Sequence, residues 1–544
     1  MKKNIHKTPD PESHLKSENK YFDVDPPVFW ISALVIIFFI LITLLVGKPM
    51  EQVFASIQDS VSENGGWFFV LAVNLFLVFS LAMAFGKFGD IRLGGQGSEP
   101  EFSRTAWFAM LFSAGMGIGI LFWSVGEPVL HYVSPPTGNG SSVLSAQKSM
   151  QYTFLHWGFH AWGIYALVGL SLAFFTFNKK LPLTISSVFH PLIGERVHGG
   201  MGKAINILAV VATLFGLATS LGLGVQQVSA GLNHLTGLPD NITVQVILIT
   251  GITLAATASV VAGLSAGVKR LSQLNIIIGA VFLLFIIFVG PTLFIMGSFV
   301  QNIGAYLQNF FELSFWTETY LQSDWQKSWT VFYWAWWISW SPFVGMFIAR
   351  ISRGRTIREF ILGVIIVPTL ITFLWLSSFG GSALYIELNG IADLATAVQS
   401  NVATSLFVLL EQFPLGVATS IVGIVLVISF FVTSSDSGSL VIDSLTAGGK
   451  LDAPVPQRVF WALTEGAVAA VLLIGGGLGA LQTAAIITGL PFALILLIMT
   501  VSLVKGLGEE KRKLDQRAME KEKRSYQENI RDIIAKREAL KSKK

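Results

Sequence analysis

Residues 329–340 read WTVFYWAWWISW and contain five of the 15 tryptophans of the chain. At 3.6 residues per turn, one helix face would carry Trp329, Tyr333, Trp336, Trp337 and Trp340. The electron-rich faces of indole rings bind cations that donate no hydrogen bonds, above all quaternary ammonium groups. A packing stripe or an interfacial belt is the alternative, but a belt needs rings only near the ends of a helix. The string therefore favours a ligand site.

A second aromatic group lies earlier in the chain. On one continuous helix, Trp157, Trp162 and Tyr165 would spread over an arc of about 140°. His156 and His160 stand four residues apart, which is a spacing that metal ligands use. Because no further acidic or histidine ligand is near them in the sequence, we expect two hydrogen-bonded polar residues and no metal site.

The string GMGIG at 115–119 places three glycines at alternate positions within an apolar stretch. Each glycine weakens a helix by about 1 kcal/mol relative to alanine. Close helix packing is one explanation, but residues two apart do not share a helix face. The spacing instead predicts an unwound stretch whose backbone faces a substrate or an ion near the membrane midplane.

Hydroxyl groups cluster in the string FFVTSSDSGS at 430–439, where Phe430, Thr433, Ser434 and Ser437 have helical spacing. Hydroxyl and carbonyl oxygens suit an alkali cation, although Ser and Thr also bond back to their own helix. Glu465 is a carboxylate inside an apolar stretch, and a functional or a hydrogen-bonded structural role are both open.

The composition indicates a membrane protein. The chain of 544 residues is 52% hydrophobic and 13% charged, whereas soluble proteins carry about 25% charged residues. It has no cysteine, and it has no HExxH, GxSxG or nucleotide-binding GxxxxGK[ST] motif. We therefore predict an all-α polytopic membrane protein that is not an enzyme, has no cofactor and has no nucleic-acid partner.

Apolar stretches long enough to cross a bilayer recur twelve times along the sequence. Their approximate bounds are 29–47, 66–86, 106–126, 157–177, 205–231, 244–264, 274–296, 328–349, 360–383, 415–440, 458–474 and 479–504. A further apolar piece at 401–413 predicts a short or partial helix. Residues 1–28 form a polar tail without a cleavable signal peptide, and 29–504 form one twelve-helix domain.

Basic residues divide unequally between alternate loops. Three lie in one set, Lys48, Lys148 and Lys327. Fifteen lie in the other, namely Lys87, Arg92, Arg104, Lys179, Lys180, Arg196, Lys203, Lys269, Arg270, Arg350, Arg353, Arg355, Arg358, Lys450 and Arg458. By the positive-inside rule, both termini of this multi-pass protein of the cell membrane are expected in the cytoplasm.

Two segments outside the predicted spans have their own patterns. Residues 297–327 alternate apolar and polar side chains at helical spacing, which predicts an amphipathic helix on the outer surface. Residues 505–544 carry 14 basic and 8 acidic residues. This composition predicts a solvated helix. The alternative is a helix that binds anionic lipid, with about 1 kcal/mol of attraction for each basic residue near the surface.

Four segments, 115–128, 156–165, 329–360 and 430–439, resemble the betaine/choline/carnitine transporter family. The resemblance extends over all twelve predicted spans. It implies the leucine-transporter fold, in which spans three to seven and eight to twelve form two inverted five-helix repeats behind two additional helices. It also implies a homotrimer.

The resemblance also implies a substrate site. The aromatic cage of the family corresponds to Trp157, Trp162, Tyr165 and Trp337, with Trp336 and Trp340 along the cytoplasmic half of the pathway and Phe347 near the site. The substrate carboxylate would lie near the backbone of Met116, Gly117 and Gly119. Choline-transporting relatives tend to have an aspartate in place of the last of these residues, so Gly119 favours a zwitterion.

The conserved sodium site of the family corresponds to Ser113, Met116, Phe430, Thr433 and Ser434. A second sodium site would use Thr213 and Phe343, but its second threonine is replaced here by Leu217. The fifth span has no basic residue that would replace sodium, as occurs in exchangers of the family.

The expected function is sodium-coupled import of a quaternary-ammonium zwitterion such as glycine betaine, by alternating access. Carnitine, ectoine and sulfonium analogues remain open as substrates. The alternatives are a sodium-independent exchanger, a choline importer, an osmosensor and a channel with an aromatic gate, although broken helices argue against a channel.

Overall fold

The computed structural model describes residues 21–115, 117–262, 267–321 and 323–541. The predicted site residue Met116 lies outside them. Within these ranges the regular elements are helices, accompanied by one isolated β-bridge between Arg92 and Thr356. The predicted all-α class is therefore confirmed.

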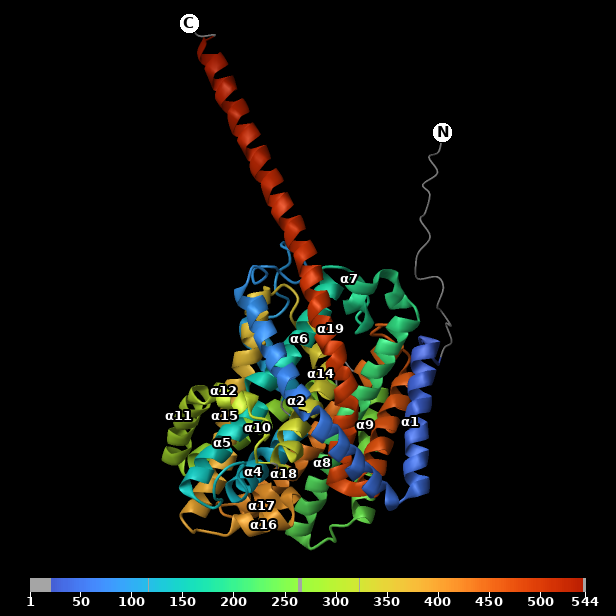
Figure 1. Ribbon diagram of the computed structural model, residues 1–544, viewed down its shortest axis with the longest axis vertical. Coiled ribbons are helices and arrows are strands. Elements are labelled where there is room, and N and C mark those ends of the chain that lie inside the picture. Colours follow the sequence, from blue (N-terminus) through green and yellow to red (C-terminus); the bar gives the residue numbers. More distant parts are fainter. Residues whose placement is uncertain (1–20, 116, 263–266, 322, 542–544) are drawn as a thin grey trace.

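The helices follow one another along the chain (Figure 1) as α1 Pro26–Val46, α2 Pro49–Phe85, α3 Arg104–Gly115, α4 Ile118–Val133, α5 Val143–Trp157, α6 Phe159–Phe177, η2 Ser186–Phe189, α7 His190–Ile193, η3 Gly194–His198, α8 Gly200–Thr236, α9 Ile242–Ala262, α10 Gly267–Val289, α11 Thr292–Gln308, α12 Phe310–Phe315, α13 Trp325–Ser328, α14 Thr330–Ile351, α15 Ile357–Leu388, α16 Leu394–Ser400, η4 Val402–Thr404, α17 Ser405–Leu410, α18 Gly416–Thr446 and α19 Val455–Lys541.

Nine helical stretches in the described ranges are long and apolar enough to cross a membrane. They are Pro26–Val46, Pro49–Phe85, Val143–Phe177, Gly200–Thr236, Ile242–Ala262, Arg270–Val289, Ile357–Leu388, Gly416–Thr446 and Val455–Lys536. The last one contains two of the predicted spans, joined by a kink with non-helical backbone at Gly476 and Gly477. The chain is thus a multi-pass membrane protein, while the number twelve and the two inverted repeats stay predictions.

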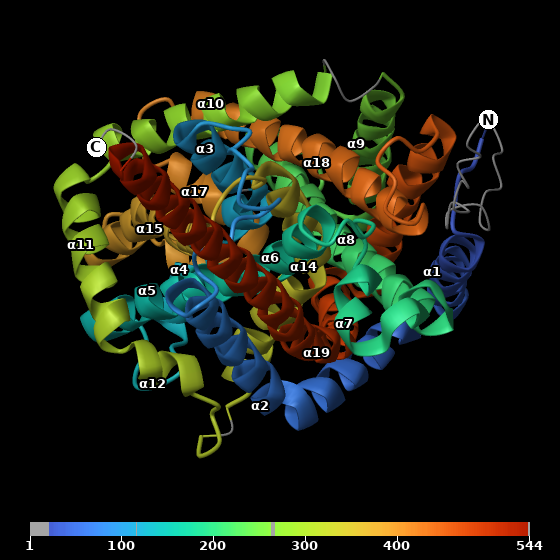
Figure 2. The same ribbon diagram turned by 90° about the horizontal axis from the view of Figure 1, so that it is seen from above.

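Helix α14, which carries the tryptophan string, lies inside the bundle (Figure 2). It packs against α6, α19, α8 and α2, and nearly all of its side chains are buried. Apolar side chains are instead exposed on peripheral helices, for example Leu45 at 85% and Phe288 at 74%. Exposed apolar surface of this kind suits contact with lipid.

Two breaks in the helices position the residues of interest. Helix α3 ends at Gly115 and α4 begins at Ile118, with Gly117 in an extended conformation between them. The predicted interruption at GMGIG is therefore present in the structure. A second break at Gly158 separates α5 from α6 and had no counterpart in the predicted span 157–177.

Short helices cover one end of α4. The predicted apolar piece at 401–413 forms η4 and α17, and α17 packs against α4 and α18. The approach is close, because a Cβ atom on Gly126 would lie 2.6 Å from Val402 Cγ2. This cover lies at the end of the molecule opposite to the projecting part of α19 (Figure 1).

The segment 297–327 contains most of α11, all of α12 and part of α13. Helix α11 packs against α15 and α5. Its Tyr306 is fully buried, whereas Val300 and Leu307 are 68% and 54% exposed. The apolar residues of the predicted amphipathic helix are thus divided between the protein and its surroundings.

The charged segment 505–544 begins inside α19, which continues without interruption from the bundle to Lys541. Its distal part projects away from the bundle, toward the side on which α1 begins (Figure 1). Near the bundle, Lys179 Nζ lies 3.2 Å from a carboxylate oxygen of Glu510. Farther out, the side chains of α19 are exposed.

Candidate functional site

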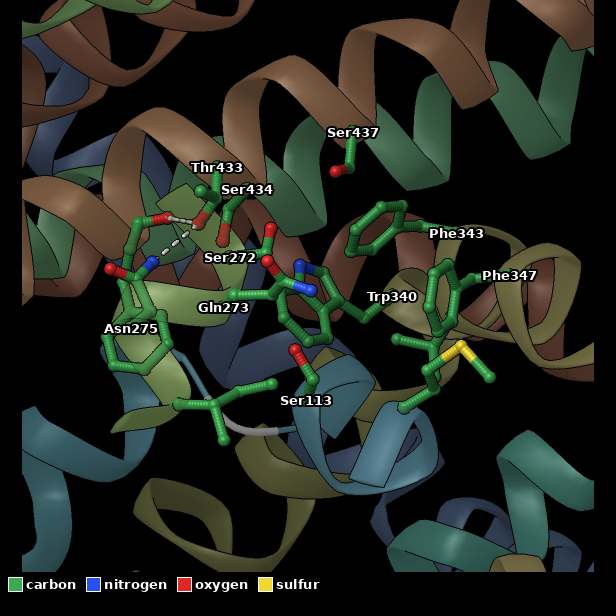
Figure 3. Close-up of a pocket in the computed structure, with 14 residues that line it drawn as sticks. Ser113, Ser272, Gln273, Asn275, Trp340, Phe343, Phe347, Thr433, Ser434 and Ser437 are labelled. Atoms are coloured by element: carbon green, nitrogen blue, oxygen red, sulfur yellow. Dashed lines mark hydrogen bonds between the residues drawn. The ribbon is translucent and has the colours of Figure 1, made fainter. Parts of the chain in front are cut away.

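A cavity of about 320 Å³ opens between α3, α10, α14 and α18 (Figure 3). It contains most of the residues predicted for the sodium site and the inner pathway. Its lining is Met110, Ser113, Ser272, Gln273, Asn275, Ile276, Trp340, Phe343, Val344, Phe347, Phe430, Thr433, Ser434 and Ser437.

The hydroxyl groups of α18 differ in their contacts. Thr433 Oγ1 donates to the Ser429 carbonyl at 3.0 Å and accepts a hydrogen bond from Asn275 Nδ2 at 3.2 Å. Ser434, in contrast, points toward the space between α18 and α3, where Ser113 also lies (Figure 3). The helix break faces this place, because a Cβ atom on Gly117 would lie 4.0 Å from Ser434 Oγ. Hydroxyl groups from α3 and α18 therefore line the same cavity, next to the helix break.

The residues predicted for a second sodium ion lie in a more apolar environment than those predicted for the first. Thr213 is buried in α8, and its hydroxyl donates to the Ala209 carbonyl at 2.7 Å. Leu217 packs against Gly438 of α18, on which a Cβ atom would lie 2.4 Å from the leucine Cδ1. Phe343 lines the cavity. An aliphatic side chain thus occupies the position of the expected second threonine.

The four predicted cage residues form one connected aromatic group. The Trp157 and Trp337 ring centroids are 5.0 Å apart with an interplanar angle of 71°. Tyr165 lies 6.3 Å from Trp337 and 5.6 Å from Trp162, also edge to face. All four are buried, and none of them lines the cavity described above. Because Trp157 is the last residue of α5, the arc of about 140° assumed for one continuous helix was wrong.

Gly119 faces Trp157 of the cage and the neighbouring Trp336. A Cβ atom there would lie 2.6 Å from Trp336 Cη2 and 3.3 Å from Trp157 Cη2. Trp336 itself stacks on Trp337 at 4.8 Å. Of the two tryptophans expected along the inner pathway, Trp340 lines the cavity, whereas Trp336 packs between Gly119 and the cage.

The indole groups fall into two classes by their hydrogen bonds. Trp157 Nε1 donates to Glu127 Oε2 at 2.8 Å, and Trp337 Nε1 donates to the His156 carbonyl at 2.8 Å. The N–H groups of Trp336 and Trp340 and the hydroxyl of Tyr165 are buried with no partner among the described residues. These three donors are available to an acceptor on a bound molecule.

A buried cluster beside the cage was missed by the sequence reasoning. His156 was expected to have no acidic neighbour, but its Nδ1 lies 2.6 Å from Glu127 Oε1, and His131 Nε2 lies 3.2 Å from the same oxygen. The ligand atoms of the three residues lie within 4.8 Å of one another, which a metal ion would require. They already hydrogen-bond to each other, so a polar cluster explains their arrangement. His160 belongs elsewhere, with its Nε2 3.1 Å from Asn74 Oδ1.

The signal that could have revealed this cluster is the spacing of Glu127 and His131, one helical turn apart in α4. The remaining polar residue of the sequence analysis, Glu465, accepts a hydrogen bond from Ser435 Oγ at 3.0 Å. Trp329 packs against His131 and Trp123, with ring centroids 4.4 Å and 5.3 Å away. It thus supports the cluster and not the cage.

Comparison with known proteins identifies the family. Residues 27–512 match the family described as BCCT, betaine/carnitine/choline family transporter. A glycine betaine/proline/choline transporter of Vibrio parahaemolyticus is 48% identical, over 92% of this chain and 93% of the relative. The glycine betaine transporter of Acinetobacter baylyi is 45% identical over 90% and 74%, and OpuD, a glycine betaine transporter of Bacillus subtilis, is 44% identical over 90% and 95%.

The match spans the helical bundle, including both halves of the broken helix, the cage and the cavity. Family members are transporters and not enzymes, in line with the lack of catalytic motifs in the sequence. This multi-pass membrane protein therefore belongs to the betaine/carnitine/choline transporter family.

Proposed function

We propose that this protein imports a quaternary-ammonium zwitterion of the glycine betaine type and couples that import to sodium. The observation that carries the proposal is the aromatic group in which Trp157 and Trp337 meet edge to face at 5.0 Å. Aromatic ring faces attract a methylated ammonium group, which offers no hydrogen-bond donor. The glycine betaine named for three relatives carries such a group.

The surroundings of the cage favour a zwitterion over a simple cation. Gly119 has no space for a side chain in this conformation, so an aspartate countercharge at this position would displace Trp336. The buried donors of Tyr165, Trp336 and Trp340 instead suit a carboxylate on the substrate. Choline, which the name of one relative includes, lacks that carboxylate and is the competing substrate.

Sodium coupling is supported by the cavity. Ser113 on α3 and Ser434 on α18 both line it, and the carbonyl-bearing break between α3 and α4 faces the same place. A cation there would hold α18 against the broken helix that also carries Gly119. Because that helix touches the cage as well, ion and substrate would stabilise the same conformation, which is how symport by alternating access requires them to act.

We also propose a location, an orientation and an oligomeric state for the transporter. We place it in the cell membrane with both termini in the cytoplasm, because the basic residues of the loops are so unequally divided. The family resemblance further suggests a homotrimer. The exposed, basic helix that follows Lys505 is suited to contact anionic lipid.

Uptake by the purified protein in liposomes tests the coupling. With an inward sodium gradient we expect glycine betaine to accumulate, and with potassium in place of sodium we expect no accumulation. Counterflow of betaine in sodium-free liposomes would instead identify an exchanger. Choline taken up in preference to betaine would contradict the zwitterion assignment.

The cage assignment makes a prediction for Trp337→Ala. A cation–π contact in a desolvated site contributes about 2 kcal/mol, so betaine affinity should fall by more than about tenfold. Binding of radiolabelled betaine to the detergent-solubilised protein measures this. Trp67→Ala, which removes a 59% exposed indole of α2, is the control and should bind normally. Unchanged affinity in Trp337→Ala would refute the cage.

A further inference from the structure

The carboxylate of Glu127 is fully buried and surrounded by donors from three elements. Its Oε1 receives His156 Nδ1 at 2.6 Å and His131 Nε2 at 3.2 Å. Its Oε2 receives Trp157 Nε1 at 2.8 Å and the hydroxyl of Tyr333. Four hydrogen bonds therefore converge on one side chain of α4, from α4 itself, α5 and α14.

The bonds suit an ionised carboxylate. Trp157 Nε1 and the Tyr333 hydroxyl donate to Oε2, and a neutral imidazole can donate to Oε1 from either histidine, so an ionised Glu127 can accept from all four partners. Each imidazole needs one proton to donate to Glu127. The second nitrogen of His156 lies 3.0 Å from the Thr330 hydroxyl, which can donate to it, and that of His131 has no partner in the described part of the chain. We assign both rings as neutral, because neither second nitrogen donates to a carboxylate or a carbonyl.

With this assignment, the cluster keeps one net negative charge next to the cage. No lysine or arginine among the described residues forms an ion pair with Glu127, whose only ion-pair contacts are to the two histidines. A buried charge without an opposite charge is unfavourable, even when it is fully hydrogen-bonded. A positively charged group bound in the cage would supply the opposite charge.

The same cluster orients the two central indole rings. Trp157 is held directly by Glu127, and Trp337 is held through the carbonyl of His156, whose ring is bonded to Glu127. Trp336, one residue away, has no such bond within the described ranges. Trp157 and Trp337, which meet edge to face at an interplanar angle of 71°, are thus the rings whose N–H groups are fixed by hydrogen bonds.

We propose that Glu127 is the positioning residue and countercharge of the cage, through which the site distinguishes a positively charged group from a neutral group of the same shape. The proposal rests on the proposed function, in which Trp157 and Trp337 hold a quaternary ammonium. It adds that the rings alone do not provide the discrimination, because the negative potential of Glu127 acts on whatever the rings enclose.

Two ligands of equal shape test this. Glycine betaine and 3,3-dimethylbutyrate share a carboxylate and differ in having a trimethylammonium or a tert-butyl group. Dissociation constants of both are measured at fixed sodium and pH, the second by competition with radiolabelled betaine. If the wild-type protein does not bind betaine, the proposed function fails. If it does, the ratio of the two constants in variants decides the role of Glu127.

In Glu127→Gln, which keeps size but not charge, the affinity for betaine should fall by at least about tenfold more than the affinity for 3,3-dimethylbutyrate, whose own weakening measures the loss of ring position. Tyr333→Phe removes a hydrogen bond but leaves the charge, so it should weaken both ligands alike. Glu465→Gln, which neutralises the buried carboxylate bonded to Ser435, should leave the ratio at the wild-type value.

Equal weakening of both ligands in Glu127→Gln, or no change in either, would overturn the proposal. A shifted ratio in Glu465→Gln would do the same, because the effect would not belong to this site. If Glu127→Gln is not monodisperse on gel filtration, Glu127→Asp replaces it. That variant retains the charge, so its ratio should stay within about twofold of the wild-type value, and a tenfold fall would contradict the countercharge.

Discussion

Within the proposed substrate site, individual indole groups differ in their hydrogen bonds although the residue type is the same. The N–H groups of Trp157 and Trp337 are hydrogen-bonded to the protein, which leaves their aromatic rings as the part that could contact a ligand. Trp336 and Trp340 keep buried N–H groups without a partner in the described residues. A zwitterion has two ends of opposite chemistry, and these two classes match the two ends. The aromatic type could be predicted from the sequence, but the bonding of each ring could not, because its partners come from other helices.

Gly119 yields a prediction at the scale of one residue. In Gly119→Ala the new methyl group would lie 2.6 Å from Trp336 Cη2, so this ring must move and the cage must change. Overpacking of a buried site costs about 1–3 kcal/mol, and we expect betaine affinity to fall by about tenfold. Equilibrium binding measures the loss. Gly251→Ala in α9, where a Cβ atom meets nothing within 4 Å, is the matched control. Wild-type affinity in Gly119→Ala would show that the rings are not held as described.

At the scale of elements, α18 connects the cavity proposed for sodium to the rest of the bundle. Asn275 of α10 bonds to Thr433, and Ser434 faces the break between α3 and α4. In the double variant Thr433→Ala, Ser434→Ala, a sodium ion would lose two hydroxyl ligands from one helix. We expect the sodium concentration for half-maximal uptake to rise at least about tenfold.

Ser429→Ala, one turn away on α18, is the control for that variant because its hydroxyl bonds back to the Leu426 carbonyl. Its sodium dependence should equal that of the wild-type protein. Measurements of initial uptake rate against sodium concentration compare the three proteins. An unaltered sodium dependence in the double variant would remove the ion from this cavity.

Some helix boundaries could be predicted from the sequence and others could not. The break at GMGIG was predictable because glycine spacing is a local property of the chain. The start of α5 at Val143 was not, since its first turns are polar and hydropathy does not register a helix that is buried in protein. The contact of Glu127 with His156 joins residues 29 positions apart, and only the packing of α4 on α5 creates it.

For the whole molecule, hydropathy was sufficient to predict the all-α membrane class. It was less informative about the bundle interior, where α14 is buried among other helices and not by lipid. The stretch α5–α6 extends beyond the one predicted span that it contains, and α19 contains two predicted spans, so the ends of helices and of predicted spans differ. The predicted orientation rests on the charges in the loops and not on the helices.

The number of sodium ions is a property of the whole transport cycle, and we propose that this protein uses one. Leu217 packs against Gly438 where a second site would need a hydroxyl, and Thr213 is bonded to its own helix. One cation crossing about 100 mV provides about 2.3 kcal/mol, and a tenfold gradient adds about 1.4 kcal/mol. Together they limit accumulation of a neutral zwitterion to roughly 500-fold, whereas two ions would permit roughly 10⁵-fold. We therefore expect betaine flux in liposomes to reverse at an outwardly directed gradient of roughly 500-fold under these conditions, and continued inward flux well beyond that gradient would require a second coupled ion.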